Sequence, residues 1–219
     1  MSLIESHTVL SAIMGSRAYG LDLPSSDVDR HGVYAAPTRA FWRLEKPPTS
    51  MSGPEPERMN WEVDHYCALA LAGKANVLEL LVSTEIEVCT PIGTELRALL
   101  PAFLSRQIAE TYQRAAMSQL HRATSEPPKW KQVMHVIRLL ITGRTLLETG
   151  TLAIRMDAQR TELLAVRRGE VDLGDCLAWV SRLRADLGAA ASMSALPEEP
   201  DRARVEEWLL SVRERGLSD

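Results

Sequence analysis

Cysteine, aromatic residues and excess positive charge are all scarce in this chain of 219 residues. Its three cysteines, Cys67, Cys89 and Cys176, are odd in number, far apart and not arranged as Cys-x-x-Cys, which argues against a disulfide framework and against a structural zinc site. The formal net charge is −4, so the chain as a whole has no positive field to attract nucleic acid or an anionic membrane. Any contact with a polynucleotide is therefore expected to be a local patch.

Long hydrophobic runs are also absent. No apolar stretch reaches 18 residues, and the first residues, Met-Ser-Leu-Ile-Glu-Ser-His, lack a basic segment followed by an apolar one. We therefore expect a cytoplasmic protein with no membrane partner. Because 45% of the residues are hydrophobic, the chain can bury the core of one large or two small domains.

The most informative stretch runs from residue 14 to residue 30 and reads MGSRAYGLDLPSSDVDR. An apolar segment at 7–14 predicts a buried strand that ends in a Gly-Ser turn, and a second strand is expected at 28–35. If the segment is extended there, Asp27 and Asp29 place both carboxylates on one face. Two carboxylates this close need a cation or a proton between them, and their hard oxygens suit Mg²⁺.

The Gly15-Ser16 turn can offer backbone N–H groups and a hydroxyl to phosphates, because successive N–H groups in a tight turn form a concavity that binds anions. A phosphate-binding turn followed by a metal-binding pair describes a nucleotide site. The alternative is that Asp-x-Asp occurs by chance, as it does in many loops, and that residues 24–27 form only a solvated turn.

The complete order is more specific: an apolar strand, Gly-Ser, ten residues, Asp-x-Asp and a second apolar strand. It resembles the signature of the DNA polymerase beta nucleotidyltransferase superfamily. The closer resemblance is to the predicted nucleotidyltransferases linked to RNA repair, and it is carried by residues 15–20, 26–29 and 30–34. That branch usually has Arg directly before the Gly of the last segment, where this chain has His31, with Arg30 one place earlier.

The resemblance implies metal-dependent transfer of a nucleoside monophosphate from a nucleoside triphosphate, with ATP as the expected donor, to an acceptor hydroxyl on RNA or on a protein. It also implies that Gly15 and Ser16 hold the β- and γ-phosphates, with Arg17 near them. Asp27 and Asp29 would bind two Mg²⁺ ions, for which Mn²⁺ can substitute. A non-catalytic module that binds nucleotide and regulates a partner, as minimal nucleotidyltransferase antitoxins do, is the alternative from another class.

Members of the superfamily use a third carboxylate on a later strand, and two candidates exist here. Glu62 lies on the strand expected at 59–63, whereas Asp64 begins the helix expected at 64–72, where an acid is favoured by the helix dipole. We therefore prefer Glu62 as the third catalytic and metal-binding carboxylate. Farther along, Glu79 is the one acid in an apolar turn, which suggests either a buried partner for an arginine or the exposed side of a short helix.

A helix is expected at 130–147, and its polar residues Lys131, His135, Arg138 and Thr142 fall on one narrow stripe of an otherwise apolar surface. The stripe either faces water, with His135 bonded to a neighbouring carboxylate, or directs Lys131, His135 and Arg138 at a triphosphate. Periodicity does not separate these interpretations. The resemblance favours the second, because the family has a similar Lys-x-x-x-His-x-x-Arg pattern.

The order of strand and helix signals predicts an α+β fold. A small mixed-sheet nucleotidyltransferase domain with flanking helices is expected at 1–90, and an all-helical domain at 91–219 completes the nucleotide and acceptor cleft. Residues 49–57 read as a loop, and residues 39–46 read as a surface helix. Four further arginines read simply as surface residues: Arg167, Arg168, Arg182 and Arg184.

Overall fold

The computed structural model describes residues 3–53, 57–124 and 126–217. Its sheet has the strand order β3-β4-β2-β1-β5, with β2 and β4 parallel and the other neighbours antiparallel. The strands are β1 (Thr8–Ile13), β2 (Arg30–Tyr34), β3 (Ser50–Ser52), β4 (Arg58–Glu62) and β5 (Ile86–Cys89). The short strand β3 lies within the segment predicted as a loop at 49–57, of which residues 54–56 lie outside the described residues.

Short helices surround this sheet: α1 (Leu3–His7), α2 (Gly15–Ala18), the 3-10 helix η1 (Thr38–Trp42), α3 (Val63–Leu71), α4 (Ala75–Val82), α5 (Pro91–Ala98) and α6 (Leu100–Phe103). Pro101 stands in the first turn of α6, where a proline is tolerated, and the next helix is α7 (Ile108–Ala123). The segment predicted as a surface helix at 39–46 is helical only in η1.

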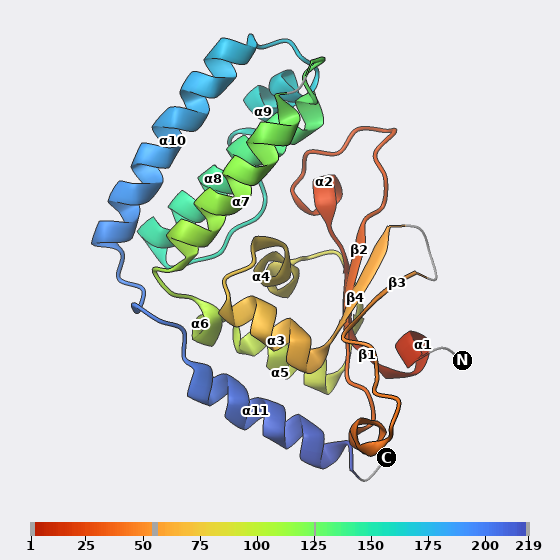
Figure 1. Ribbon diagram of the computed structural model, residues 1–219. Coiled ribbons are helices and arrows are strands. Elements are labelled where there is room, and N and C mark those ends of the chain that lie inside the picture. The colour runs from red at the N-terminus through yellow and green to blue at the C-terminus, as the bar shows by residue number, and fades with distance from the viewer. Residues whose placement is uncertain (1–2, 54–56, 125, 218–219) are drawn as a thin grey trace.

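Four helices form a separate block beside the sheet (Figure 1): α7, α8 (Trp130–Thr149), α9 (Arg160–Arg167) and α10 (Leu173–Met193). Helix α8 packs against the other three, so most of its surface is buried, as its apolar sequence predicts. It ends at Gly150, whose φ of +70° is the left-handed conformation that glycine adopts most readily. No helix within the described ranges is both long and apolar enough to span a membrane.

The last helix, α11 (Arg202–Arg215), returns to the sheet and packs against α3 and α6 (Figure 1). Its Trp208 donates a hydrogen bond to Glu95 of α5 at 2.8 Å, and Arg213 accepts one from Thr38 of η1 at 2.6 Å through its carbonyl oxygen. The mixed sheet and helical block confirm the predicted α+β class. The boundary at residue 90 stays a prediction, and the contacts place α11 with the N-terminal elements rather than with the helical block.

Candidate active site

The Gly-Ser turn and Asp29 meet at one edge of the sheet because β1 and β2 are antiparallel neighbours. Ile13 at the end of β1 pairs with Arg30 at the start of β2, and the Met14 N–H donates to the Asp29 carbonyl at 2.8 Å. Gly15 has a φ of +66°, and a Cβ built on it would lie 1.9 Å from Oδ2 of Asp29. Only glycine therefore leaves room for this carboxylate against the turn.

Asp27, the other member of the pair, is exposed and is bound by a residue from the helical block. The Lys131 Nζ at the start of α8 lies 3.2 Å from Asp27 Oδ2. Within the turn, Ser16 is buried and its carbonyl accepts a hydrogen bond from the Leu21 N–H at 2.8 Å, whereas Arg17 is exposed. The structure thus brings Lys131 to Asp27 and Gly15 to Asp29.

The donor set decides what kind of metal site this edge can form. Within the described residues, no group of three or more His, Cys, Asp or Glu side chains could hold a metal ion. Mg²⁺ commonly takes only one or two protein carboxylates and completes its octahedral shell with water and substrate phosphates. The described residues form no complete protein cage, and the role of Asp27 and Asp29 in holding an ion shared with a phosphate stays a prediction.

The structure does not bring Glu62 to this pair. In the parallel register of β2 and β4, Arg30 pairs with Arg58, whereas Glu62 pairs with Tyr34 at the other end of both strands. Four residues of extended strand separate these positions, which is about 13 Å.

The carboxylate of Glu62 is also fully engaged where it lies. It is 1% exposed, forms two bonds to the Arg213 guanidinium at 2.8 and 2.7 Å, and accepts backbone N–H bonds from Ala36 and Asp64. The alternative candidate, Asp64, lies 3.2 Å from the same guanidinium. The structure therefore places Glu62 in a buried ion pair with Arg213 and not beside the predicted metal pair, and its catalytic and metal-binding role stays a prediction.

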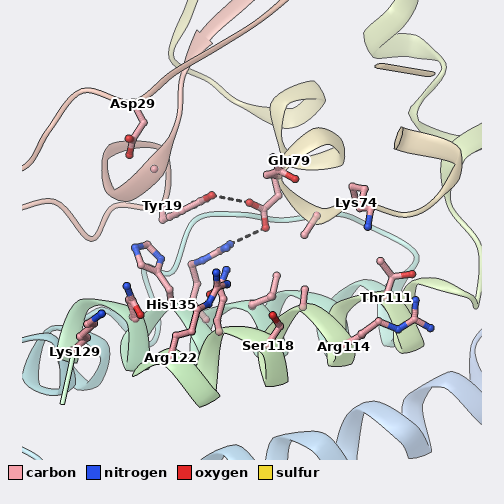
Figure 2. A pocket seen from close by; sticks show the side chains of 18 of the residues that line it. Tyr19, Asp29, Lys74, Glu79, Thr111, Arg114, Ser118, Arg122, Lys129 and His135 are labelled. Carbon is pink, nitrogen blue, oxygen red and sulfur yellow. Dashed lines mark hydrogen bonds and ion pairs between the residues drawn. The ribbon is translucent and has the colours of Figure 1, made fainter. Parts of the chain in front are cut away.

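A cleft of about 1100 Å³ opens beside Gly15 and Asp29, between the sheet edge with α4 and the helices α7 and α8 (Figure 2). Cationic side chains dominate its lining: Lys74, Arg114, Arg122 and Lys129. Its carboxylates are Asp29 and Glu79, and the second is already paired with Arg138. The local charge of the cleft is thus opposite in sign to the net charge of −4 of the whole chain.

Arg138 reaches the cleft from α8 but is bound within the protein. Its Nη1 donates to Glu79 Oε1 at 2.7 Å, and the Tyr19 hydroxyl donates to Glu79 Oε2 at 2.7 Å (Figure 2). The guanidinium carbon lies 3.8 Å from the centre of the Tyr19 ring. Glu79 is therefore the buried partner of an arginine, and the charge of Arg138 is compensated before any triphosphate enters.

His135 lines the same cleft, with its ring edge-to-face against Tyr19 at 6.1 Å between centroids. Burial, together with the nearby cations Arg138, Lys131 and Arg167, lowers the pKa of His135 to about 3. The imidazole is thus neutral at pH 7, so it cannot supply the fixed positive charge that the sequence pattern suggested. The other interpretation of the stripe had His135 bonded to a neighbouring carboxylate, and no carboxylate of the described residues forms such a bond. A neutral imidazole can still donate one N–H to a ligand.

This environment predicts that His135 lowers the stability of the folded protein in acid. Because its folded pKa lies below the unfolded value, the unfolded state takes up a proton first, so stability is lost as the pH falls from about 6.5 towards 3. The free energy of unfolding should fall between pH 7 and pH 5 by up to about 2 kcal/mol less in His135→Gln than in the wild type. Urea unfolding at the two pH values measures this difference, with His121→Gln, which replaces an exposed histidine of α7, as the matched control. An unchanged pH dependence in His135→Gln would contradict the assignment.

Sequence reasoning missed two arginines of α9 that hold the loop before Asp27. Arg160 Nε donates to the Gly20 carbonyl at 2.8 Å, and Arg167 binds the Leu21 carbonyl through Nη1 and Ser26 Oγ through Nη2, the latter at 3.0 Å. Arg167 was expected to be a surface residue. Its partners lie more than 140 residues away in the sequence, and no local pattern marks such a contact.

Comparison with known proteins gave one match. The family model described as RNA repair pathway DNA polymerase beta family matches residues 4–211. Neither the curated proteins nor the solved structures gave a match. The matched range spans the Gly-Ser turn, both aspartates, the cleft-lining helices and most of α11.

Proposed function

The chain belongs to the RNA repair pathway DNA polymerase beta family, and from this membership we propose that it is a metal-dependent nucleotidyltransferase. It would move a nucleoside monophosphate from a nucleoside triphosphate, with ATP as the expected donor, to an acceptor hydroxyl and release pyrophosphate. The observation that carries this proposal is the contact between the Gly15 turn and the Asp29 carboxylate at the mouth of a basic cleft. A phosphate and a cation would be held side by side there.

In this proposal Gly15 and Ser16 hold the β- and γ-phosphates, with Arg17 beside them, and Asp27 and Asp29 hold Mg²⁺ or Mn²⁺. When bound, the metal would lower the pKa of the acceptor hydroxyl for in-line attack on the α-phosphate and would neutralise the leaving pyrophosphate. Since Glu62 is absent from this edge, a second ion would depend on the same two aspartates and on substrate oxygens.

Lys131 would have two roles in this mechanism, one before and one after a metal ion binds. Its ammonium lies 3.2 Å from Asp27, so it neutralises that carboxylate when no metal does. A bound cation would compete for Asp27, and Lys131 would then be free to turn to the triphosphate, where positive charge stabilises phosphoryl transfer. His135 would contribute as a neutral hydrogen-bond donor, and Arg138 by holding Tyr19 and Glu79 in place.

We infer that the acceptor is an RNA end rather than a protein side chain. A cleft of about 1100 Å³ exceeds the usual size of a site for one small ligand, so it has room for a nucleotide together with a second substrate. Arg114, Ser118 and Arg122 follow one another along the face of α7 that lines the cleft, over about 12 Å (Figure 2). This line of donors suits the backbone of a polynucleotide strand.

The test of the reaction is incubation of the purified protein with each labelled nucleoside triphosphate, Mg²⁺ and an RNA that carries a free 3′-hydroxyl. We expect labelled RNA and an equal amount of pyrophosphate. Tight binding of Mg²⁺ and nucleotide without pyrophosphate release would instead favour the non-catalytic regulatory module. Label on the protein itself or on an added protein would favour a side-chain acceptor.

A salt titration tests the RNA acceptor separately. Arg114→Ala with Arg122→Ala should weaken RNA binding and reduce the slope of log affinity against log salt by roughly 1.4, about 0.7 for each lost phosphate contact. The matched control removes two exposed arginines of α10, Arg182 and Arg184, which do not line the cleft, and should leave the slope unchanged. An absence of measurable RNA binding at low salt would refute the RNA acceptor.

A further inference from the structure

A loop of seven residues, 20–26, joins the end of α2, the helix that begins at Gly15, to Asp27, so its shape determines how the two halves of the candidate site face each other. The loop is folded on itself by two bonds: the Ser26 N–H donates to the Leu23 carbonyl at 2.8 Å, and the Leu23 N–H donates to Ser26 Oγ at 2.9 Å. Ser26 is a buried polar residue directly before Asp27. A shift of its hydroxyl would therefore move the chain at Asp27.

Helix α9 holds both ends of this loop. The Arg167 guanidinium binds the Leu21 carbonyl with one nitrogen and Ser26 Oγ with the other, and Arg160 binds the Gly20 carbonyl. A planar guanidinium presents its donors in a fixed fork, so it sets the separation of two acceptors in a way that a lysine ammonium cannot. The preceding segment adds a backbone bond, from the Met156 N–H to the Tyr19 carbonyl at 3.0 Å.

We propose that Arg167, supported by Arg160, is a positioning residue that fixes Asp27 relative to the Gly15 turn, so that the helical block sets the metal affinity of the sheet edge. Arg167 touches the loop and not the reacting groups, and it acts through Ser26. The inference rests on the proposed function, because it assumes that Asp27 and Asp29 take Mg²⁺ or Mn²⁺. Replacing a residue that orients a metal ligand without binding the metal itself typically weakens metal affinity by 10- to 100-fold.

Arg167→Lys is the decisive substitution, because it keeps the positive charge and removes the planar guanidinium that donates to two acceptors at a fixed separation. We expect Mn²⁺ binding to the full chain, measured by electron paramagnetic resonance with a non-hydrolysable nucleotide present, to weaken about tenfold. Ser26→Ala should weaken it similarly, and the double substitution should add little, because both remove the same link. Arg168→Lys changes the neighbouring arginine, which pairs with Glu170 on the surface, and should bind Mn²⁺ as the wild type does.

The outcomes separate the two proposals. If the wild type binds Mn²⁺ and folded Arg167→Lys binds it equally well, the positioning role is overturned and the contact only joins α9 to the loop. If both single substitutions weaken Mn²⁺ binding but their effects simply add, Arg167 does not act through Ser26 and the proposal also fails. If the wild type itself binds no Mn²⁺, the metal site of the proposed function fails, and the positioning role fails with it. Should Arg167→Lys not fold, Ser26→Ala carries the test, because it leaves the arginine in place.

Discussion

Asp29→Asn is expected to reduce nucleotidyl transfer by at least about 10³-fold, because a metal-bound carboxylate supports several kcal/mol of charge stabilisation and each 1.36 kcal/mol is tenfold in rate. The fold should remain intact, since asparagine has the same shape in the space beside Gly15 and the backbone bond from Met14 to residue 29 does not involve the side chain. Release of labelled pyrophosphate measures the loss, and circular dichroism checks the fold.

Two controls separate a metal ligand from a charge that is merely nearby. Asp22→Asn removes an exposed carboxylate from the same loop and should leave transfer unchanged. Glu62→Gln should lower the melting temperature, because Arg213 loses its buried ionic partner and keeps only Asp64, but should retain transfer. A folded Asp29→Asn protein with wild-type turnover would contradict the proposed site. Loss of transfer in a fully stable Glu62→Gln protein would make Glu62 a catalytic residue after all.

Glu79→Leu is expected to destabilise the protein by about 3–5 kcal/mol, the usual cost of leaving one member of a buried ion pair without its partner. The Glu79 and Arg138 side chains are 1% and 7% exposed, so water cannot replace the missing carboxylate. Tyr19 would lose its acceptor at the same time. Denaturant unfolding measures the change as a lower midpoint at a similar slope.

The double substitution Glu79→Leu with Arg138→Met should recover much of this loss, because hydrophobic residues of similar volume often replace a buried ion pair at little cost. Glu110→Ala is the matched control, since it breaks the exposed pair with Arg114 on α7 and should cost no more than about 0.5 kcal/mol. A Glu79→Leu protein that loses less than about 1 kcal/mol would show that the pair is not the buried support described here.

The features that sequence predicted well are those set by neighbours in the chain. The apolar runs before Gly15 and after Asp29 predicted two strands, and the structure has β1 and β2 at these places, paired antiparallel. The Gly-Ser turn and Asp29 then meet at one edge as a consequence of that pairing. Of the stripe on α8, His135 and Arg138 line the cleft and Lys131 pairs with Asp27, in keeping with helical periodicity, which is a local property.

The features that sequence did not predict depend on partners far along the chain. Arg213 binds Glu62 across 151 residues, and Glu79 binds Arg138 across 59, so no spacing rule links either pair. The neutrality of His135 likewise follows from burial and from cations on α8 and α9. Periodicity shows which way a side chain points, but the fold decides whether its charge is still available to a ligand.

The return of α11 to the sheet has a consequence for synthesis. Glu62 is buried against a guanidinium that leaves the ribosome 151 residues after it. Until residue 213 emerges, the nascent N-terminal elements would have to bury a carboxylate without its cation, which is costly, or leave that end of β4 open to water. We therefore expect the sheet to reach its final packing only after the helical block has been made, against the usual order in which N-terminal units fold first.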